Sequence, residues 1–148
     1  IWNLIPLANH SVEDILKESK GDQQYFAKWD HSLILLDPQQ STVIAFVVGY
    51  ERAAEDNNIY PKDSLHLKSI SVRHEDQNKG IGKKLLQTWL KYNKDKGFTY
   101  LKGDFCFSVQ TNGAKWNDHV QKFYESFGFI QTAIKKYPDK TDNVFFLN

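Results

Sequence analysis

Several residue types are scarce in this sequence of 148 residues, and each shortage excludes a class of protein. The single cysteine, Cys106, excludes an internal disulfide framework and fits a reducing compartment, so we expect a cytoplasmic protein. No apolar run approaches the ~20 residues of a membrane span, so we expect no membrane association. Methionine is missing even at position 1, so we expect that the start was trimmed or processed.

Charge of one sign is not in excess either. Nineteen Lys and Arg against eighteen Asp and Glu give a formal charge of +1, which argues against a surface built for nucleic acid. His10, His31 and His74 show no metal-ligand spacing, so no metal is expected. With 41% hydrophobic and 25% charged residues, the composition is that of a soluble globular chain. The length predicts one domain over residues 1–148.

Hydrophobic periodicity and turn residues predict a series of mixed elements. In the first part of the chain they are a short strand at 2–5, helices over 12–20 and 23–29, strands at 33–36 and 43–48 joined as a hairpin, and a loop over 52–64. In the second part they are a strand at 65–72, a helix over 82–96, a strand at 99–109, a helix over 116–127, and a hairpin of 129–137 with 144–147 around a turn at 138–143. This order predicts an α+β fold, a mixed and mostly antiparallel sheet with helices on both faces.

The strand at 65–72 breaks the period of two. Leu65 and Leu67 alternate correctly, and so do Ile70 and Val72, but Leu67 and Ile70 are three residues apart. One extra residue near position 68 or 69, a β-bulge, would keep all four side chains on the buried face. The alternative is that Ile70 and Val72 face a second layer on the other side of the sheet.

The segment Gln77-Asn78-Lys79-Gly80-Ile81-Gly82 lies between this strand and the following helix. Glycines allow the backbone to approach a ligand closely, and the first turn of a helix offers unpaired N–H groups to an anion. A diphosphate is a natural ligand for such a segment. The alternative is a tight turn with a glycine-rich helix start. The segment matches neither the Walker A motif nor G-x-G-x-x-G.

Two motifs together resemble the Gcn5-related N-acetyltransferase (GNAT) family. The first is the strand 65–72 followed by Gln/Arg-x-x-Gly-x-Gly/Ala, found here at 77–82. The second is Asn-x-x-Ala-x-x-Phe-Tyr-Glu-x-x-Gly-Phe, found here from Asn117 to Phe129 with Val120 in place of the small Ala. The motifs occur in family order with a strand between them, so the sequence resembles a single GNAT-like domain.

The resemblance implies binding of acetyl-CoA in a wedge that opens where the bulge separates two strands. It implies that backbone groups of Ile70, Ser71 and Val72 pair with the pantetheine arm. It assigns the pyrophosphate to the loop and first helical turn, that is, to Gln77, Asn78, Lys79, Gly80, Ile81, Gly82 and Lys83. Asn117 matches a position that contacts the CoA arm, and Tyr124 matches the tyrosine that protonates the leaving thiolate.

Direct attack of a neutral amine on a thioester forms an oxyanion, which the backbone N–H near Val72 could stabilise, and it requires a base or a water chain to one. Positions 68 and 69 carry no carboxylate, so Glu51 and His66 are the first candidates for the base, with Asp104 and His119 weaker. The structural alternatives are a strand-end residue for Glu51 and a surface-facing strand residue for His66.

We therefore expect an acyltransferase that moves an acetyl group from acetyl-CoA to a primary amine. The acceptor is a small-molecule amine or a peptide or protein amine, and the protein is a monomer or homodimer. One alternative is a non-catalytic acyl-CoA-binding or regulatory domain. Another is a basic nucleic-acid-binding domain, which the near-zero net charge disfavours.

Overall fold

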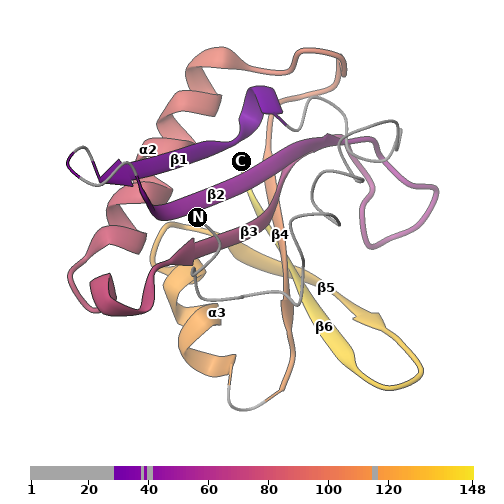
Figure 1. Ribbon diagram of the computed structural model, residues 1–148. Coiled ribbons are helices and arrows are strands. Elements are labelled where there is room, and N and C mark those ends of the chain that lie inside the picture. Colours follow the sequence, from indigo (N-terminus) through magenta and orange to yellow (C-terminus); the bar gives the residue numbers. More distant parts are fainter. Residues whose placement is uncertain (1–28, 38, 40–41, 115–116) are drawn as a thin grey trace.

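The computed structural model describes residues 29–37, 39, 42–114 and 117–148, which form a six-stranded sheet with two α-helices (Figure 1). The predicted strand at 2–5, the helix over 12–20 and residues 23–28 of the next helix lie outside the described residues. The elements are the 3₁₀ turn η1 (Trp29–His31), β1 (Leu33–Asp37), β2 (Thr42–Arg52), β3 (Ser64–Val72), the 3₁₀ turn η2 (His74–Asp76), α2 (Ile81–Lys96), β4 (Phe107–Asn112), α3 (Asp118–Glu125), β5 (Ile130–Lys136) and β6 (Thr141–Leu147).

The strand order is β1-β2-β3-β4-β6-β5, and every neighbouring pair is antiparallel except β3 with β4. This one parallel pair requires a crossover connection, which α2 supplies. The predicted α+β class with a mixed, mostly antiparallel sheet is confirmed. The helix α2 ends at Lys96, the predicted last residue. Gly97, with φ of 70°, follows it and donates its N–H to the carbonyl of Asn93 (2.8 Å).

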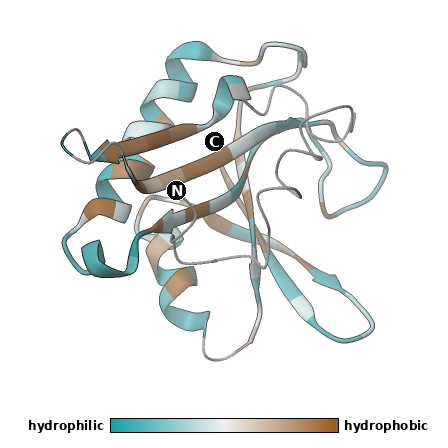
Figure 2. Cartoon of the chain, viewed as in Figure 1, coloured by the Kyte–Doolittle hydropathy of each residue, from teal (hydrophilic) through white to brown (hydrophobic). Residues whose placement is uncertain are grey.

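The main core lies between the sheet and both described helices. Leu65, Leu67 and Val109 contribute from the sheet, Leu86 and Trp89 from α2, and Tyr124 from α3. A smaller cluster on the opposite face contains Tyr60, Cys106, Val144 and Phe146. In Figure 2 hydrophobic colour runs along β1 and β2, and hydrophilic colour covers much of α2. Burial of the α2 stripe therefore holds the start of that helix against the end of β3.

The predicted bulge in β3 is confirmed. Val48 of β2 pairs with Ser69, whereas the next residue, Gly49, pairs with Leu67, so Lys68 is the extra residue. As a result Leu65, Leu67 and Ile70 are all buried in the main core, and Val72 packs against it. The alternative, in which Ile70 and Val72 face the other layer, is excluded.

The parallel pairing of β3 with β4 stops at Leu67 and Val109. This point, which we call the fork, coincides with the bulge at Lys68. Beyond it the described part of β3 has no ladder partner on the β4 side. A bulge bends the strand that carries it and increases the local twist, which explains why the two strands diverge here.

Three predicted boundaries were wrong. The strand predicted at 99–109 begins only at Phe107 and runs to Asn112, because the N–H groups of residues 99–101 bind a buried carboxylate instead of a neighbouring strand. The helix predicted over 116–127 ends at Glu125 instead of position 127, and its predicted first residue lies outside the described residues. The last hairpin turns at 137–140, where Tyr137 donates its N–H to the carbonyl of Lys140 (2.8 Å), so β6 begins earlier than predicted.

A substitution of Gly49 tests the packing of α2 on the sheet. A Cβ at this position would lie 2.5 Å from Cζ2 of Trp89 and 3.2 Å from the carbonyl oxygen of His31. We expect Gly49→Ala to lower the free energy of unfolding by about 1–3 kcal/mol, the usual cost of overpacking. Urea denaturation measures this. Gly82→Ala is the control, because its Cβ would meet only Val72 at an ordinary 3.7 Å. Equal stability of the two variants would contradict the expectation.

Candidate active site

The loop between β3 and α2 presents an uncapped helix start. Asn78 and Gly80 have positive φ angles of 61° and 80°, and Gly80 is the N-cap residue of α2. The described residues supply no side-chain hydrogen bond to this cap. The first helical bond runs from the N–H of Lys84 to the carbonyl of Gly80, so the N–H groups of the first turn have no intrahelical acceptor. Together with the helix dipole, these groups form an anion-binding site.

The edge of β3 at the fork is also oriented for binding. The N–H of Arg73 is donated to the carbonyl of Ile44 on β2 (2.7 Å), and backbone groups alternate in direction along a strand. The backbone groups of Ile70 and Val72 therefore turn away from β2 and toward the fork. The carbonyl of Val72 accepts a bond from Nε2 of Gln77 (3.3 Å), which ties the loop to the end of the strand.

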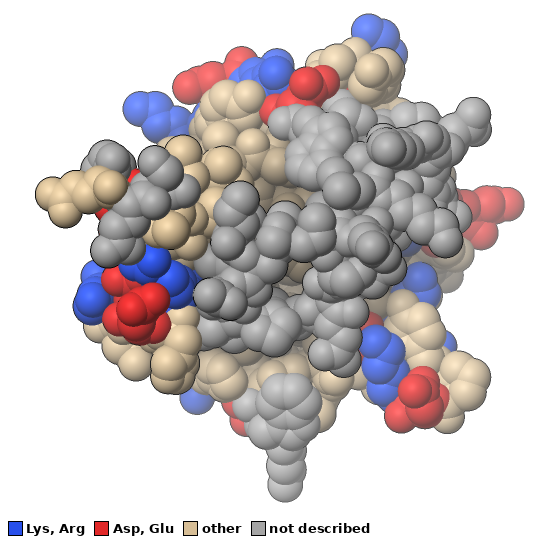
Figure 3. All heavy atoms as spheres, in the orientation of Figure 1, with Lys and Arg blue, Asp and Glu red and all other residues tan. Residues whose placement is uncertain are grey.

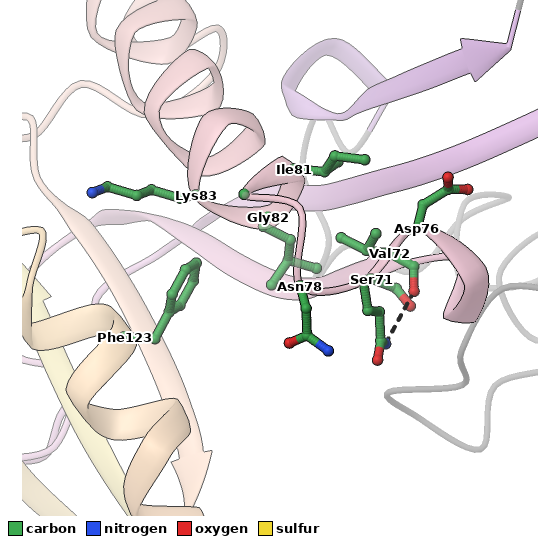
Figure 4. A pocket seen from close by; sticks show the side chains of 11 residues that line it. Ser71, Val72, Asp76, Asn78, Ile81, Gly82, Lys83 and Phe123 are labelled. Carbon is green, nitrogen blue, oxygen red and sulfur yellow. Dashed lines mark hydrogen bonds between the residues drawn. The ribbon is translucent and has the colours of Figure 1, made fainter.

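A cavity of about 420 Å³ joins this strand edge to the helix start (Figure 4). It is lined by Ile70, Ser71, Val72, Asp76, Gln77, Asn78, Gly80, Ile81, Gly82, Lys83 and Phe123. Phe123 reaches from α3 toward the start of α2 in Figure 4. Most of the residues predicted to bind the cofactor are thus brought together, and an extended ligand with an anionic end fits a cavity with these walls.

The charges around the loop are already partly paired. Arg73 Nε is 2.6 Å from Asp76 and 3.1 Å from Glu75, and Lys79 Nζ is 3.4 Å from Asp76. The hydrogen bond from Arg73 lowers the pKa of Asp76, which keeps this lining carboxylate ionised and bound to its cations. Figure 3 shows Lys and Arg interspersed with Asp and Glu on the face in view. Anion binding here therefore depends on the loop amides more than on a broad positive surface.

Three residues predicted to bind the cofactor do not line this cavity. Lys79 is largely exposed and bound to Asp76. Asn117 is buried at the start of α3, where its Nδ2 is 3.4 Å from the carbonyl oxygen of Asn112. Tyr124 lies in the core, with its ring 5.7 Å from that of Phe129, and burial raises its pKa. Tyr124 therefore holds its proton at physiological pH.

Two lining residues, Asp76 and Phe123, were missed. Phe123 directly precedes Tyr124 in the second motif, and the sequence pattern assigned it only to the core. Asp76 follows Arg73 by three residues, a spacing at which opposite charges can pair within a helical turn. That spacing was the available signal, and the structure shows Arg73, the residue before η2, paired with Asp76 at its end.

Glu51 is held as a buried structural carboxylate. Its side chain is fully buried and accepts hydrogen bonds from the N–H groups of Thr99, Tyr100 and Leu101 at 2.8–2.9 Å. Nε2 of His31 is 2.9 Å from the same carboxylate. Burial acts to raise the pKa of Glu51, but these hydrogen bonds outweigh it and the pKa is lowered. The carboxylate of Glu51 therefore has its hydrogen-bond donors within the protein and needs none from a substrate.

His66 lies beside the fork on the face away from α2 and α3. It is 6% exposed, its Nδ1 is 2.8 Å from Oγ of Ser108, and its ring contacts those of Tyr50 and Tyr60. Burial, with the positive charges of Arg52, Lys68 and Lys135, lowers its pKa well below the usual value. The interpretation of His66 as a surface-facing strand residue is therefore wrong, since the ring is buried and neutral.

Asp104 and His119, the weaker candidates, lie exposed on a connecting segment and on α3, and neither lines the cavity. Among the described residues, no group of three or more His, Cys, Asp or Glu side chains could hold a metal ion. Within the same part of the chain, no helix is both long and apolar enough to cross a membrane.

Comparison with known proteins agrees with this geometry. The family model described as "Acetyltransferase (GNAT) domain" matches residues 30–131. The chain therefore belongs to the GNAT acetyltransferase family, whose activity is acetyl transfer from acetyl-CoA. No curated protein matches the sequence.

Solved structures share the fold at low sequence identity. The ribosomal-protein-S18-alanine N-acetyltransferase of Escherichia coli is 17% identical, with a TM-score of 0.56 over 90% of this chain and 74% of that one. An N-acetyltransferase of Staphylococcus aureus Mu50 is 15% identical, with a TM-score of 0.60 over 97% and 86%. The NatC complex bound to Gag peptide and CoA is 16% identical, with a TM-score of 0.58 over 79% and 70%. At such identities the likeness shows the fold alone.

Replacing Glu51 tests its structural role. Because its folded pKa is lowered, its contribution to stability is present above the unfolded pKa and is lost as pH falls through the folded pKa. We expect Glu51→Gln to lower the free energy of unfolding by about 3 kcal/mol near neutral pH, since one oxygen and the charge are lost from a buried pair. The deficit shrinks at acid pH.

Urea unfolding of both proteins at about pH 7 and about pH 4 measures this effect. Glu55→Gln is the matched control, because Glu55 is 40% exposed in its ion pair with Arg52 and should cost under about 1 kcal/mol. A pH-independent deficit, or none, would show that Glu51 is not held as an ionised structural group.

Proposed function

We propose that this protein is an N-acetyltransferase that transfers the acetyl group of acetyl-CoA directly to a primary amine. The observation that supports it most is the cavity that joins the uncapped start of α2 to the β3 edge at the fork. An anion at the helix start and an extended arm along Ile70 and Val72 would place the end of a long thioester at the fork, between the two diverging strands.

The binding roles follow from the groups present. The N–H groups at the start of α2, near Gly80, Ile81 and Gly82, receive the pyrophosphate of CoA. The backbone of Ile70 and Val72 pairs with the amide groups of the pantetheine arm, as an added strand would. Gly82 leaves space beside Val72, since a Cβ there would already lie 3.7 Å from Val72 Cγ2.

The chemical step is nucleophilic addition and elimination at the thioester carbon. The lone pair of the neutral amine forms the C–N bond, and the oxyanion is stabilised by backbone N–H groups of β3 beyond the bulge. When the C–S bond breaks, the thiolate takes a proton and leaves as the thiol. We assign that proton to Tyr124, whose raised pKa keeps it protonated. We assign the base to neither Glu51 nor His66. After the C–N bond forms, the nitrogen gives its proton to water, and the phenolate of Tyr124 takes a proton back from water.

The acceptor is an amine, and the structural neighbours include a ribosomal-protein-S18-alanine N-acetyltransferase and a complex bound to a peptide and CoA. We therefore place peptide amines beside small-molecule amines in the first substrate panel. Cytoplasmic location and a monomeric or homodimeric state stay predictions.

A non-catalytic acyl-CoA-binding domain is the second candidate. The observation in its favour is that Glu51, the predicted carboxylate base, is committed to three backbone N–H groups and to His31. Release of free thiol from acetyl-CoA across the amine panel separates the two functions. Turnover with any amine supports the enzyme, and tight CoA binding without turnover supports the regulatory domain.

The loop assignment is tested by filling the cavity at its helical end. Gly82→Leu places a branched side chain against Val72, so we expect the affinity for CoA to fall at least about tenfold, or about 1.4 kcal/mol. Isothermal titration calorimetry measures it. Gln87→Leu, on the exposed side of α2, is the control for added apolar volume on the same helix. Unchanged binding by Gly82→Leu would refute the assignment.

The role of Tyr124 is tested by removing its hydroxyl. We expect Tyr124→Phe to lower kcat by about 100-fold, the usual value of a general acid, with the affinity for CoA changed less than about twofold. Steady-state thiol release and calorimetry measure the two quantities. Tyr92→Phe, an exposed position on α2, controls for loss of a tyrosine hydroxyl. A Tyr124→Phe enzyme with the parent kcat would remove Tyr124 from the mechanism.

A further inference from the structure

A chain of two serines ends on the ring of His66. Ser64 and His66 are two residues apart on β3, and Ser108 of β4 is the direct partner of His66 in the parallel register. The two serine Oγ atoms are 2.6 Å apart, and Oγ of Ser108 is 2.8 Å from Nδ1 of His66. Both serines are fully buried. Such a chain, closed off from water, fixes where each of its protons lies.

The number of donors decides the direction of this chain. Each hydroxyl carries one hydrogen, and within the described part of the protein Oγ of Ser64 has no partner besides Ser108. If Ser64 donates to Ser108 and Ser108 donates to Nδ1, every hydroxyl hydrogen is used. In the reverse direction Nδ1–H donates to Ser108 and Ser108 to Ser64, which leaves the hydrogen of the fully buried Ser64 without an acceptor among the described residues. Proteins avoid such orphan donors. In the forward direction the hydrogen left over is Nε2–H, on a ring that is 6% exposed and can meet a ligand.

The surroundings of the ring keep it uncharged. His66 lies against the rings of Tyr50 and Tyr60, and the positive charges that act on it come from Arg52, Lys68 and Lys135. Burial and these cations both disfavour the imidazolium. A neutral ring that accepts at Nδ1 carries its one proton on Nε2.

We infer that Ser64 and Ser108 hold His66 as a neutral imidazole with its proton on Nε2, so that His66 donates a hydrogen bond to an oxygen of the substrate at the fork instead of accepting the proton of the amine. Ser64 and Ser108 are positioning residues that act through His66. This inference rests on the proposed function for the identity of the substrate, but the position of the proton does not.

The proton is located by nitrogen NMR on protein with ¹⁵N-labelled histidine rings, without substrate. An unprotonated ring nitrogen resonates far downfield of a protonated one, and the His66→Gln spectrum identifies the His66 signals among those of the five histidines. We expect Nδ1 unprotonated and Nε2 protonated. Ser108→Ala should move the ring toward a mixture of tautomers, Ser64→Ala should do so less, and the exposed Ser126→Ala should not. A proton on Nδ1 in the parent protein overturns the inference, whatever its activity.

Two substitutions of His66 separate a donor from a base. Gln can place an amide N–H where Nε2–H lies and an oxygen where Ser108 donates, but it cannot accept the amine's proton. Leu fills similar space with neither group. With the best amine of the panel, we expect kcat/KM of His66→Gln to exceed that of His66→Leu at least tenfold, with CoA affinity equal in both.

Equal, strong losses of kcat/KM in both variants would identify His66 as a base and overturn the donor role. Parent-like kcat/KM in both variants would also overturn the donor role, because it would show that the reaction does not need His66. Failure of the parent protein to release thiol with any amine would count against the proposed function alone, because the NMR result still decides the tautomer. Calorimetry with CoA shows that each variant is folded.

Discussion

One extra residue in β3 is the constraint on which the site depends. Lys68 has no counterpart in β2, and the parallel pairing with β4 ends beside it, at Leu67 and Val109. Without the bulge, Ile70 and Val72 would face the opposite side of the sheet, and the main core would lose two of its apolar contacts. The same residue therefore keeps the core continuous and opens the strand edge that a ligand can use. Stability and binding are served by one irregularity, so β3 cannot be made regular without a cost to both.

The second constraint is the buried carboxylate of Glu51, which accepts backbone hydrogen bonds that a neighbouring strand would otherwise accept. The chain between α2 and β4 is an irregular segment, and the N–H groups of residues 99–101 need acceptors there. Glu51, at the end of β2, supplies both of its oxygens to them and to His31. Nδ1 of His31 is in turn 2.6 Å from Oδ1 of Asn93 on α2. This network joins β2, α2 and the connecting segment, which places the start of β4, and hence one wall of the fork, relative to the helix.

The parts that the sequence predicted are those encoded by neighbouring residues. The bulge followed from a spacing of three between Leu67 and Ile70, and the helix start from the glycines of the loop. The parts it missed depend on contacts far apart in the chain. The spacing of apolar residues from position 99 fits a strand, yet Glu51, about 50 residues earlier, draws the amides away. Likewise the sequence suggested an exposed strand position for His66, because the alternation of apolar residues along a strand cannot show that Ser108 and two tyrosines bury the ring.

These contacts also explain why an ionisable residue near the fork need not be a base. Glu51 has donors for both oxygens, and its lowered pKa makes it a poor proton acceptor. In the tautomer that we infer for the neutral His66 ring, the hydroxyl chain donates to Nδ1, and Nε2 then carries the hydrogen. A thioester reacting with an amine develops negative charge on oxygen before it releases the thiol, so donors around the fork stabilise the transition state more directly than a base does. Backbone amides of β3 and the inferred Nε2–H of His66 would supply hydrogen-bond donors at the fork, and the buried Tyr124 would supply the proton of the leaving thiol. This arrangement fits an enzyme whose amine arrives already neutral.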